Sequence, residues 1–243
     1  MKKPLPVVNS PTLVCTLPVS KQDIKYRPFI VKEQKAMLLA QQSDEEQTIA
    51  ETVRSVVIAC TNGTMDYDNT PTADVAYFFL QMQISSVGPE RKVSIPCVSC
   101  EEPILMNIDL SDITVDVSKV ITQVMLNDVM GVTFRLPSMT DTFESLKESD
   151  GISRNETLIN RLIVNIFDAD TVYDMKEYSD QERSEWISTL NDAQLMEIQK
   201  FVDGIPELRH ELKYTCPHCH TKQRKLLEGL HGFFRLGDDQ RID

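Results

Sequence analysis

The apolar residues in the first third of the chain recur with helical spacing. Residues 31–42 (VKEQKAMLLAQQ) are rich in helix formers, and Ser43 with Glu46 forms a capping-box pattern that predicts the start of a second helix. A third helix is predicted over about 72–86. The second helix would present one apolar stripe, made of Ile49, Val53, Val56, Val57 and Cys60. These segments predict a helical block over 31–88.

Alternation of apolar and polar residues predicts strands elsewhere. Segments 12–18 and 23–29 indicate a β-hairpin inside an N-terminal segment, 1–30. Residues 93–95 alternate into the sequence CVSC, and a returning strand follows. Its apolar residues occupy every second position, at Ile104, Met106, Ile108 and Leu110. A further strand is predicted over 129–137 (VMGVTFRLP).

Helical spacing returns over 138–205. Asn155 is placed to cap a first helix, Ser179 with Glu182 forms another capping box, and Asn191 is placed to cap a last helix. The first of these helices would carry on one face Leu158, Ile159, Leu162, Ile163, Ile166 and Phe167. We therefore expect a second helical block here.

Composition and charge narrow the classes of partner. The chain is 41% hydrophobic and 26% charged, which is ordinary for a globular protein, and its net charge is −12. An acidic chain repels phosphate backbones, which argues against nucleic-acid binding. The sequence has no apolar run after Lys2 and Lys3, and the apolar stretch at 75–79 is too short to span a bilayer. We expect no membrane contact and a cytosolic setting in which thiols stay reduced.

Four of the six cysteines form two CxxC pairs that predict a metal site. Cys97 with Cys100, and Cys216 with Cys219, each lie between segments that read as paired strands. This spacing lets two sulfurs reach one ion, and four thiolates close a tetrahedron around Zn²⁺ with no position left for water. We therefore predict one structural zinc per chain. The gap of residues 101–215 between the pairs is long for a minimal zinc ribbon.

Other interpretations of the cysteines stay open at this point. The two pairs could be separate reduced thiols, an iron–sulfur site or a disulfide. His220 follows Cys219 and is a reserve ligand, whereas His218 lies inside the knuckle and is expected to face solvent. A redox pair would require a helix N-terminus at the CxxC, and the flanks here are strand-like. Cys15 and Cys60 are expected in the core.

The chain lacks the sequence signatures of common enzymes. It contains no GxGxxG or GxxxxGK[ST] phosphate loop and no HExxH or GxSxG motif. We therefore expect a non-enzymatic protein. The fold class predicted from these patterns is α+β, with an antiparallel zinc-ribbon-like sheet built from sequence-distant hairpins and two helical blocks. The expected parts are an N-terminal hairpin (1–30), a helical block (31–88), the zinc-ribbon-like part (89–137 and 206–234), a helical insertion (138–205) and a flexible tail (235–243).

Several spaced motifs resemble one known family. The opening PTLVCTLPVSKQDIKYRPFIVKEQKAMLLAQQSDEE, with TLP, YRPF and VKEQKAMLLA, is similar to the start of the baseplate hub and hub-assembly proteins of T-even-like contractile-tailed bacteriophages. The sequence SVG at 86–88 and the ending YSDQERSEWISTL…CPHCHTKQRKLLEGLHGFF also resemble this family. The resemblance spans roughly residues 10–234.

The resemblance implies a virion protein of the tail baseplate that passes through the host cytoplasm during assembly. Its implied role is a structural component of the central hub that contacts other hub proteins, and a homo-oligomer is compatible with it. One alternative is a hub-assembly chaperone that is absent from the mature virion. A second is a zinc-ribbon nucleic-acid-binding module. The segment YRPFIVKEQK (26–35) is either a docking surface or an ordinary strand-to-helix junction.

Overall fold

Helix α3 (Thr72–Val87) contributes nine buried residues to the first of two units of the chain. The computed structural model describes residues 10–43, 45–145, 147, 151–229 and 240–241. Unit 1 comprises Met1–Tyr67, Ala73–Val115 and Leu208–Asp243, and unit 2 comprises Asp68–Thr72 and Asp116–Glu207.

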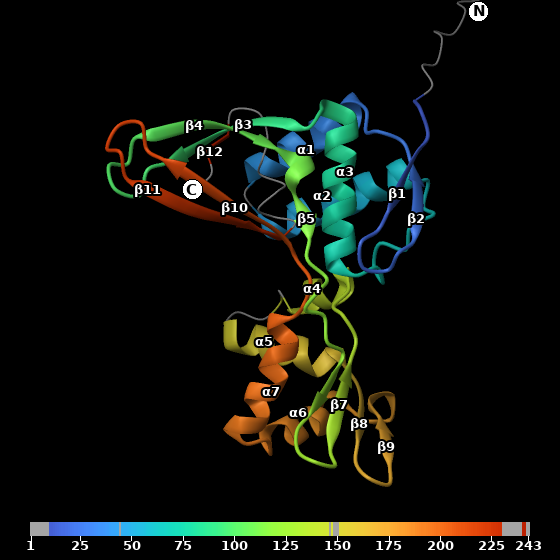
Figure 1. Cartoon of the computed structure of the whole chain (residues 1–243). Coiled ribbons are helices and arrows are strands. Elements are labelled where there is room, and N and C mark those ends of the chain that lie inside the picture. Colours follow the sequence, from blue (N-terminus) through green and yellow to red (C-terminus); the bar gives the residue numbers. More distant parts are fainter. Residues whose placement is uncertain (1–9, 44, 146, 148–150, 230–239, 242–243) are drawn as a thin grey trace, which may run out of the picture. The chain divides into compact units, whose positions relative to one another are not determined.

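The N-terminal part of unit 1 is a hairpin with three helices (Figure 1). Strands β1 (Leu13–Thr16) and β2 (Asp23–Tyr26) pair antiparallel, as expected from their alternation. Helices α1 (Val31–Ser43) and α2 (Glu46–Thr61) follow, and α3 matches the helix predicted over 72–86. The stripe of α2 is buried as predicted, with Cys60 1% exposed.

A buried carboxylate fastens the β1–β2 turn to α3. Asp74 is 0% exposed and accepts backbone N–H groups of Val19 at 2.7 Å and Ser20 at 2.8 Å. Nearby, Tyr26 meets Phe78 edge-to-face with ring centroids 5.1 Å apart. Because both contacts join the hairpin to one helix, they fix the hairpin against the core of unit 1.

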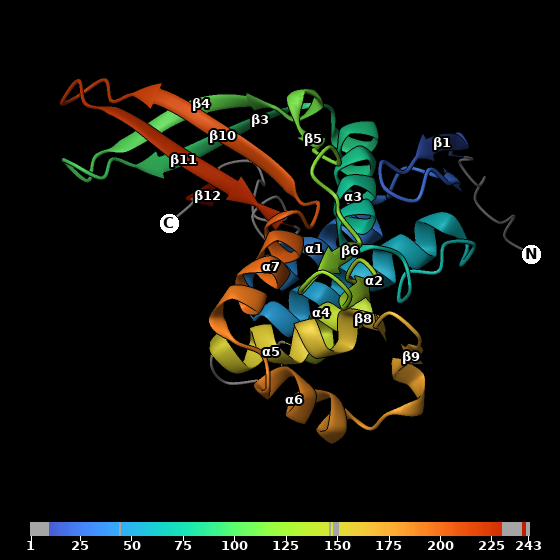
Figure 2. The same cartoon turned by 60° about the horizontal axis from the view of Figure 1, so that its bottom comes forward.

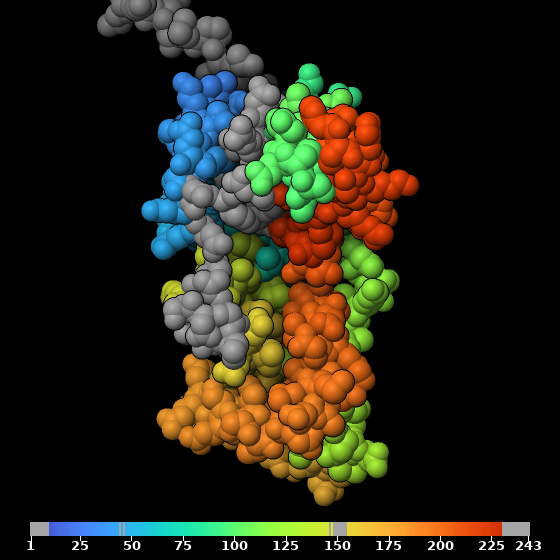
Figure 3. Space-filling model, turned by 90° about the vertical axis from the view of Figure 1, so that its left-hand side faces the viewer, coloured from blue at the N-terminus to red at the C-terminus, as the bar shows by residue number. Residues whose placement is uncertain are grey.

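Two long hairpins extend from the same unit. Strands β3 (Glu90–Pro96) and β4 (Pro103–Asp109) form the first, and β10 (Leu208–Thr215) and β11 (Lys222–Glu228) form the second. Figure 2 shows them side by side, and Figure 3 shows their outer ends in contact, with β10–β11 in red beside β3–β4 in green. Their inward residues join α3 in one core that includes Leu80, Ile95, Ile108, Leu212 and Leu227.

The two hairpins belong to separate three-stranded sheets. The 3-10 turn η1 (Leu110–Asp112) leads from β4 to β5 (Thr114–Val115), which pairs with β10. Strand β12 (Gln240–Arg241) pairs with β3 in parallel. The expected single antiparallel sheet is therefore wrong in detail, since the hairpins face each other without a shared ladder. The α+β class is confirmed.

Unit 2 is built on a four-stranded antiparallel sheet. Its strands are β6 (Gln123–Met125), β7 (Gly131–Phe134), β8 (Ile163–Phe167) and β9 (Val172–Asp174), in that spatial order. Its helices are α4 (Met139–Ser145), α5 (Gly151–Leu162), α6 (Asp180–Ser188) and α7 (Asp192–Asp203), with the 3-10 turn η2 (Met175–Glu177) after β9. Helices α5 and α7 lie on one side of the strands in Figure 1. Phe134 on β7 stacks on Phe201 of α7 with centroids 4.2 Å apart.

An ion cluster holds α4 and α5 of unit 2 together. Asp141 is 1% exposed and accepts hydrogen bonds from the guanidinium groups of Arg135 and Arg161 and from the backbone and hydroxyl of Ser138. Burial alone would raise the pKa of Asp141, but the hydrogen bonds from Arg135 and Ser138 outweigh it and hold the pKa well below its usual range.

Three predictions inside the helical segments need correction. The helix expected through Phe167 ends at Leu162, and β8 follows, because a run of β-branched residues fits a buried strand. Asn155 lies within α5 and is not its cap. Glu45 caps α2 without a side-chain bond, so the Ser43–Glu46 capping box does not form.

Other predictions of local structure are confirmed. The capping box of Ser179 with Glu182 is present at α6. Asn191 caps α7, and its side chain accepts a hydrogen bond from the backbone amide of Gln194. The strand expected over 129–137 exists as β7. However, β7 pairs with β6 and β8 in unit 2, whereas we had expected it in the zinc-ribbon-like part.

Part of the chain's C-terminal end lies outside the described residues. The expected tail over 235–243 falls there except for Gln240 and Arg241, which form β12. In the described part of the chain, no helix combines the length and the apolar character that a membrane crossing requires.

Candidate metal centre

The structure brings the four predicted cysteines together at the outer ends of the two hairpins. Sulfur atoms of Cys97, Cys100, Cys216 and Cys219 all lie within 4.8 Å of one another. The Cys97–Cys219 sulfurs are 3.6 Å apart and the Cys100–Cys216 sulfurs 3.7 Å. In a tetrahedron with metal–sulfur bonds of about 2.3 Å, neighbouring sulfurs lie about 3.8 Å apart. The cluster therefore has the size of a four-thiolate site for a single ion.

The first knuckle is a hydrogen-bonded turn between β3 and β4. The Cys97 amide donates to the Glu102 carbonyl at 3.0 Å, and the Glu101 amide donates back to the Cys97 carbonyl at 2.8 Å. The Ser99 amide points at the Cys97 sulfur, 3.4 Å away. Such N–H donors favour the thiolate form that a metal requires.

The second knuckle repeats this geometry between β10 and β11. The Cys216 amide donates to the Thr221 carbonyl at 3.0 Å, and the His220 amide donates to the Cys216 carbonyl at 3.0 Å. The His218 amide lies 3.4 Å from the Cys216 sulfur. Because segments with different sequences reach the same turn, the CxxC spacing itself determines the knuckle shape.

Each knuckle has one residue in the left-handed region. Glu101 has φ +62° and His220 has φ +58°, at equivalent positions. A β-carbon is unfavourable in this conformation, so both residues carry backbone strain of about 1 kcal/mol or more. The backbone conformation of the turn therefore fixes the position of His220.

Side chains from outside the motifs support the cluster. The Gln223 side-chain amide on β11 donates to the Cys97 sulfur at 2.9 Å, and its oxygen accepts the Val98 amide at 3.3 Å. The Cys219 sulfur lies 3.3 Å from the Thr221 hydroxyl. The sequence pattern did not predict the contacts of Gln223 and Thr221 with the cysteine sulfurs, because neither residue lies in a ligand motif. Only the inward register of Gln223 on β11, opposite Tyr214, could have suggested its role.

The thiols of the first knuckle differ in acidity. Burial raises the pKa of Cys97, but amide N–H groups of Cys100 and Ser99 outweigh burial and lower the pKa to about 6. At Cys100, the Glu102 amide lowers the pKa, yet the bond shared with the Cys97 sulfur raises it to about 12. A bound cation would favour the thiolate form of these sulfurs, because metal ligation requires deprotonated cysteine.

Among the residues that the structure describes, no other sulfur or imidazole group joins the cluster. His218 and His220 are exposed, and the group of converging ligand atoms contains neither. Cys15 and Cys60 are buried in the core of unit 1, as predicted. All six cysteines are free in the structure, so the disulfide alternative is not supported. The donor set suits a soft, tetrahedral ion, and zinc fits it without an open coordination position.

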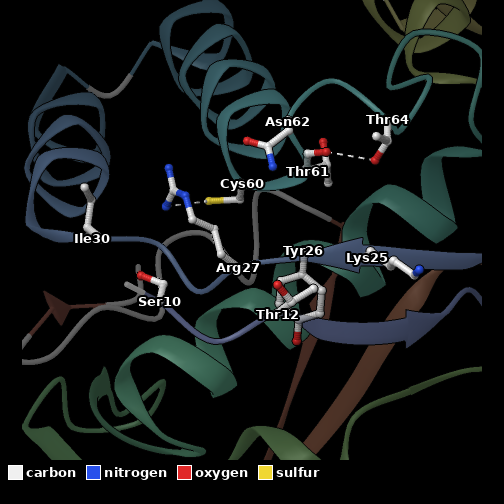
Figure 4. A pocket seen from close by; sticks show the side chains of 10 residues that line it. All are labelled: Ser10, Thr12, Lys25, Tyr26, Arg27, Ile30, Cys60, Thr61, Asn62 and Thr64. Atoms are coloured by element: carbon white, nitrogen blue, oxygen red, sulfur yellow. Dashed lines mark hydrogen bonds between the residues drawn. The ribbon is translucent and has the colours of Figure 1, made fainter. Parts of the chain in front are cut away.

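A hollow of about 610 Å³ lies beside the β1–β2 hairpin, and Arg27 and Cys60 are among the residues that line it (Figure 4). Its Arg27 side chain is engaged by Glu33 at 2.8 Å, by the Pro28 carbonyl and by the Cys60 sulfur. Burial raises the pKa of Cys60 to about 11, so this thiol stays protonated near neutral pH and is a poor nucleophile.

A second hollow, of about 370 Å³, lies on the outer face of the β10–β11 hairpin and is lined by basic residues. Lys213 and Arg224 are opposite each other in the ladder, and Lys222 follows at the knuckle end. Glu211 pairs with Lys213 at 2.8 Å and with Arg224 at 3.6 Å. The paired carboxylate reduces the positive charge that this face offers to an anion.

Comparison with known proteins agrees with the resemblance stated above. The model of one family, described as T4 bacteriophage base plate protein, matches residues 10–235. No curated protein and no solved structure matches. The matched region includes both CxxC knuckles, all of unit 2 and most of unit 1. The chain therefore belongs to the family of T4 bacteriophage base plate proteins.

Proposed function

We propose that the protein is a non-enzymatic structural component of the central hub of a contractile phage tail, where it makes protein–protein contacts. Its family places it among phage baseplate proteins and implies a location in the virion tail. Within this proposal, the host cytoplasm is its location before the tail is complete, and other hub proteins are its partners.

We infer further that Cys97, Cys100, Cys216 and Cys219 hold one structural Zn²⁺ in a zinc-ribbon-like arrangement. The observation that carries this inference is the convergence of four sulfurs from hairpins more than a hundred residues apart. A four-thiolate shell leaves zinc no open position for substrate, so its contribution is to folding. The ion would join the ends of the two hairpins, which share no ladder.

Mass spectrometry of purified virions tests the hub proposal. We expect the protein in mature baseplates at a fixed copy number per tail. A Cys219→Ser variant, which removes one ligand from a partly exposed position, should fail to enter baseplates, whereas Ser99→Ala in the first knuckle should enter normally. Absence of the wild-type protein from purified tails would contradict a structural role.

An assembly factor is the alternative, supported by the same family membership. In that case baseplates would fail to form without the gene, although mature particles would contain none of the protein. A nucleic-acid-binding module is the second alternative, and the basic face with Lys213, Lys222 and Arg224 favours it. It predicts DNA binding that weakens steeply with salt and is lost in Lys222→Ala. Binding that is absent at low salt would contradict it.

A further inference from the structure

The negative charge of the protein is concentrated in unit 2. Residues 68–72 and 116–207 contain 19 acidic and 8 basic residues, a net charge of −11. The remaining residues contain 18 acidic and 17 basic residues, a net charge of −1. Unit 1 is thus nearly neutral, and the field of unit 2 attracts cationic partners.

The sheet of unit 2 carries an apolar row on the face opposite its core. The strand registers place Met125, Gly131, Phe167 and Val172 in one line across all four strands. The neighbouring line contains Val124, Val132, Ile166 and Tyr173, which pack into the core with α7. Since side chains alternate between the two faces, the first line points away from the core. Val172 is 66% exposed and Met125 is 45% exposed.

A glycine at the centre of this row lets it form a continuous surface. A β-carbon on Gly131 would lie 2.4 Å from the Phe167 ring and 2.9 Å from the Met125 sulfur. The side chains of Phe167 and Met125 therefore lie over the backbone of β7, in the space that a side chain at position 131 would occupy. Val129, in the turn before β7, is 56% exposed.

The segments that carry the four strands contain acidic residues and no basic ones. Segments 123–134 and 163–174, which carry the four strands, contain four aspartates and no lysine or arginine. These residues are Asp128, Asp168, Asp170 and Asp174. Alternation places Asp174, two residues after Val172 on β9, on the same face as the row. Asp168 instead accepts a hydrogen bond from the hydroxyl of Tyr173, which lies in the core-facing line.

We propose that this outer sheet face docks a segment of another protein that presents apolar side chains flanked by lysine or arginine. Burial of the apolar row against the partner would stabilise the complex. The negative charge of unit 2 favours a partner whose apolar residues are surrounded by basic ones. A second copy of this chain is a disfavoured partner, because its unit 2 would bring a net charge of −11 towards another unit of net charge −11. The proposal rests on the proposed function, since it names a surface for contacts between baseplate proteins.

Binding of a short peptide that alternates leucine with lysine tests this surface, with fluorescence anisotropy of the labelled peptide as the readout. The full chain should bind it, and Val172→Lys or Met125→Lys should weaken binding by about tenfold or more, since each loses apolar contact and adds repulsion. Leu105→Lys on β4, at a residue 78% exposed in unit 1, is the matched control and should leave binding unchanged. All three side chains are exposed, so unfolding midpoints should stay within error of the wild type.

Four results would overturn the proposal: no binding, equal loss in Leu105→Lys, equal binding of a peptide that alternates leucine with glutamate, or self-association of the chain that Val172→Lys abolishes. Phage tails separate this proposal from the proposed function. If Val172→Lys protein enters baseplates at the wild-type copy number, the docking surface is wrong and the hub proposal stands. If even wild-type protein is missing from tails, the hub proposal fails by itself.

Discussion

Gln223 donates its side-chain amide to the sulfur of Cys97 across 126 residues of sequence, at 2.9 Å. The same side chain accepts the Val98 amide, so one residue of the second hairpin holds the knuckle of the first. This link joins the two halves of the cysteine cluster directly, through side-chain hydrogen bonds.

Replacement of Gln223 should weaken metal retention without removing a ligand. In Gln223→Ala the Cys97 sulfur loses a donor that stabilises its charge, and the loss of such supporting bonds typically costs about tenfold or more in metal affinity. We expect faster zinc transfer to a competing chelator, at unchanged stoichiometry. Arg224→Ala, which alters the neighbouring outward side chain, should transfer zinc at the wild-type rate. Equal rates in all three proteins would contradict the supporting role.

Glycine in the strained knuckle positions should stabilise the protein. Glu101 and His220 both have positive φ, and glycine removes the steric cost of the β-carbon there. We expect Glu101→Gly and His220→Gly each to raise the free energy of unfolding by about 1 kcal/mol, measured by denaturant titration of the zinc-loaded protein. Ser99→Gly has no such strain to relieve and should destabilise slightly. A loss of zinc in His220→Gly would instead make His220 a ligand.

Removal of the Asp74 carboxylate should destabilise unit 1. Asp74→Ala leaves the buried N–H groups of Val19 and Ser20 without their acceptor, and we expect a loss of about 2–3 kcal/mol in denaturant unfolding. Asp23→Ala, an exposed position in the same hairpin, should cost far less even though it loses the bond from Thr16. Similar losses in both variants would contradict the assigned role of Asp74.

Asp141 should make the stability of the protein fall in acid. Its folded pKa lies below the ordinary value of about 3.9, so its contribution is complete above that value and is lost as the pH falls below it. Asp141→Asn should cost about 2 kcal/mol at pH 7, a modest figure because Arg135 and Arg161 are partly exposed. The gap in unfolding free energy between wild type and variant should stay constant from pH 7 to about pH 5 and begin to narrow as the pH falls below about 3.9.

The exposed Glu144→Gln change on α4 is the control for the acid prediction. Glu144 forms an ion pair with exposed Lys147, so its change to Gln should alter the stability at pH 7 and its pH dependence only slightly. A gap between wild type and Asp141→Asn that does not narrow at all as the pH falls from about 5 to about 2 would contradict the assignment.

The sequence predicted those helices and strands whose apolar residues recur with one clear spacing. It also predicted the cysteine cluster. Helices α1 and α3 and the hairpins around CVSC and CPHCH formed close to their expected positions, because alternation and helical spacing were unambiguous there. The stretch from Leu158 to Phe167 was misread, since its apolar spacing fits one helix as well as a helix followed by a strand. Pairing with β7 makes residues 163–167 a strand.

Long-range relationships could not be derived from local patterns. The placement of β7 in a second sheet depends on its pairing with β8, thirty or so residues later, which no local signal encodes. The cysteines were found because two CxxC pairs form a motif that is visible in the sequence. Gln223 was missed because a single amide at one strand position carries no motif.

X-ray absorption at the zinc edge of the protein purified without added metal tests the central claim most directly. We predict about one zinc per chain with a shell of four sulfurs at about 2.3 Å, and loss of that shell in Cys216→Ser but not in Cys60→Ser. A shell that contains imidazole nitrogen, or protein that is folded and free of metal, would contradict the four-cysteine centre.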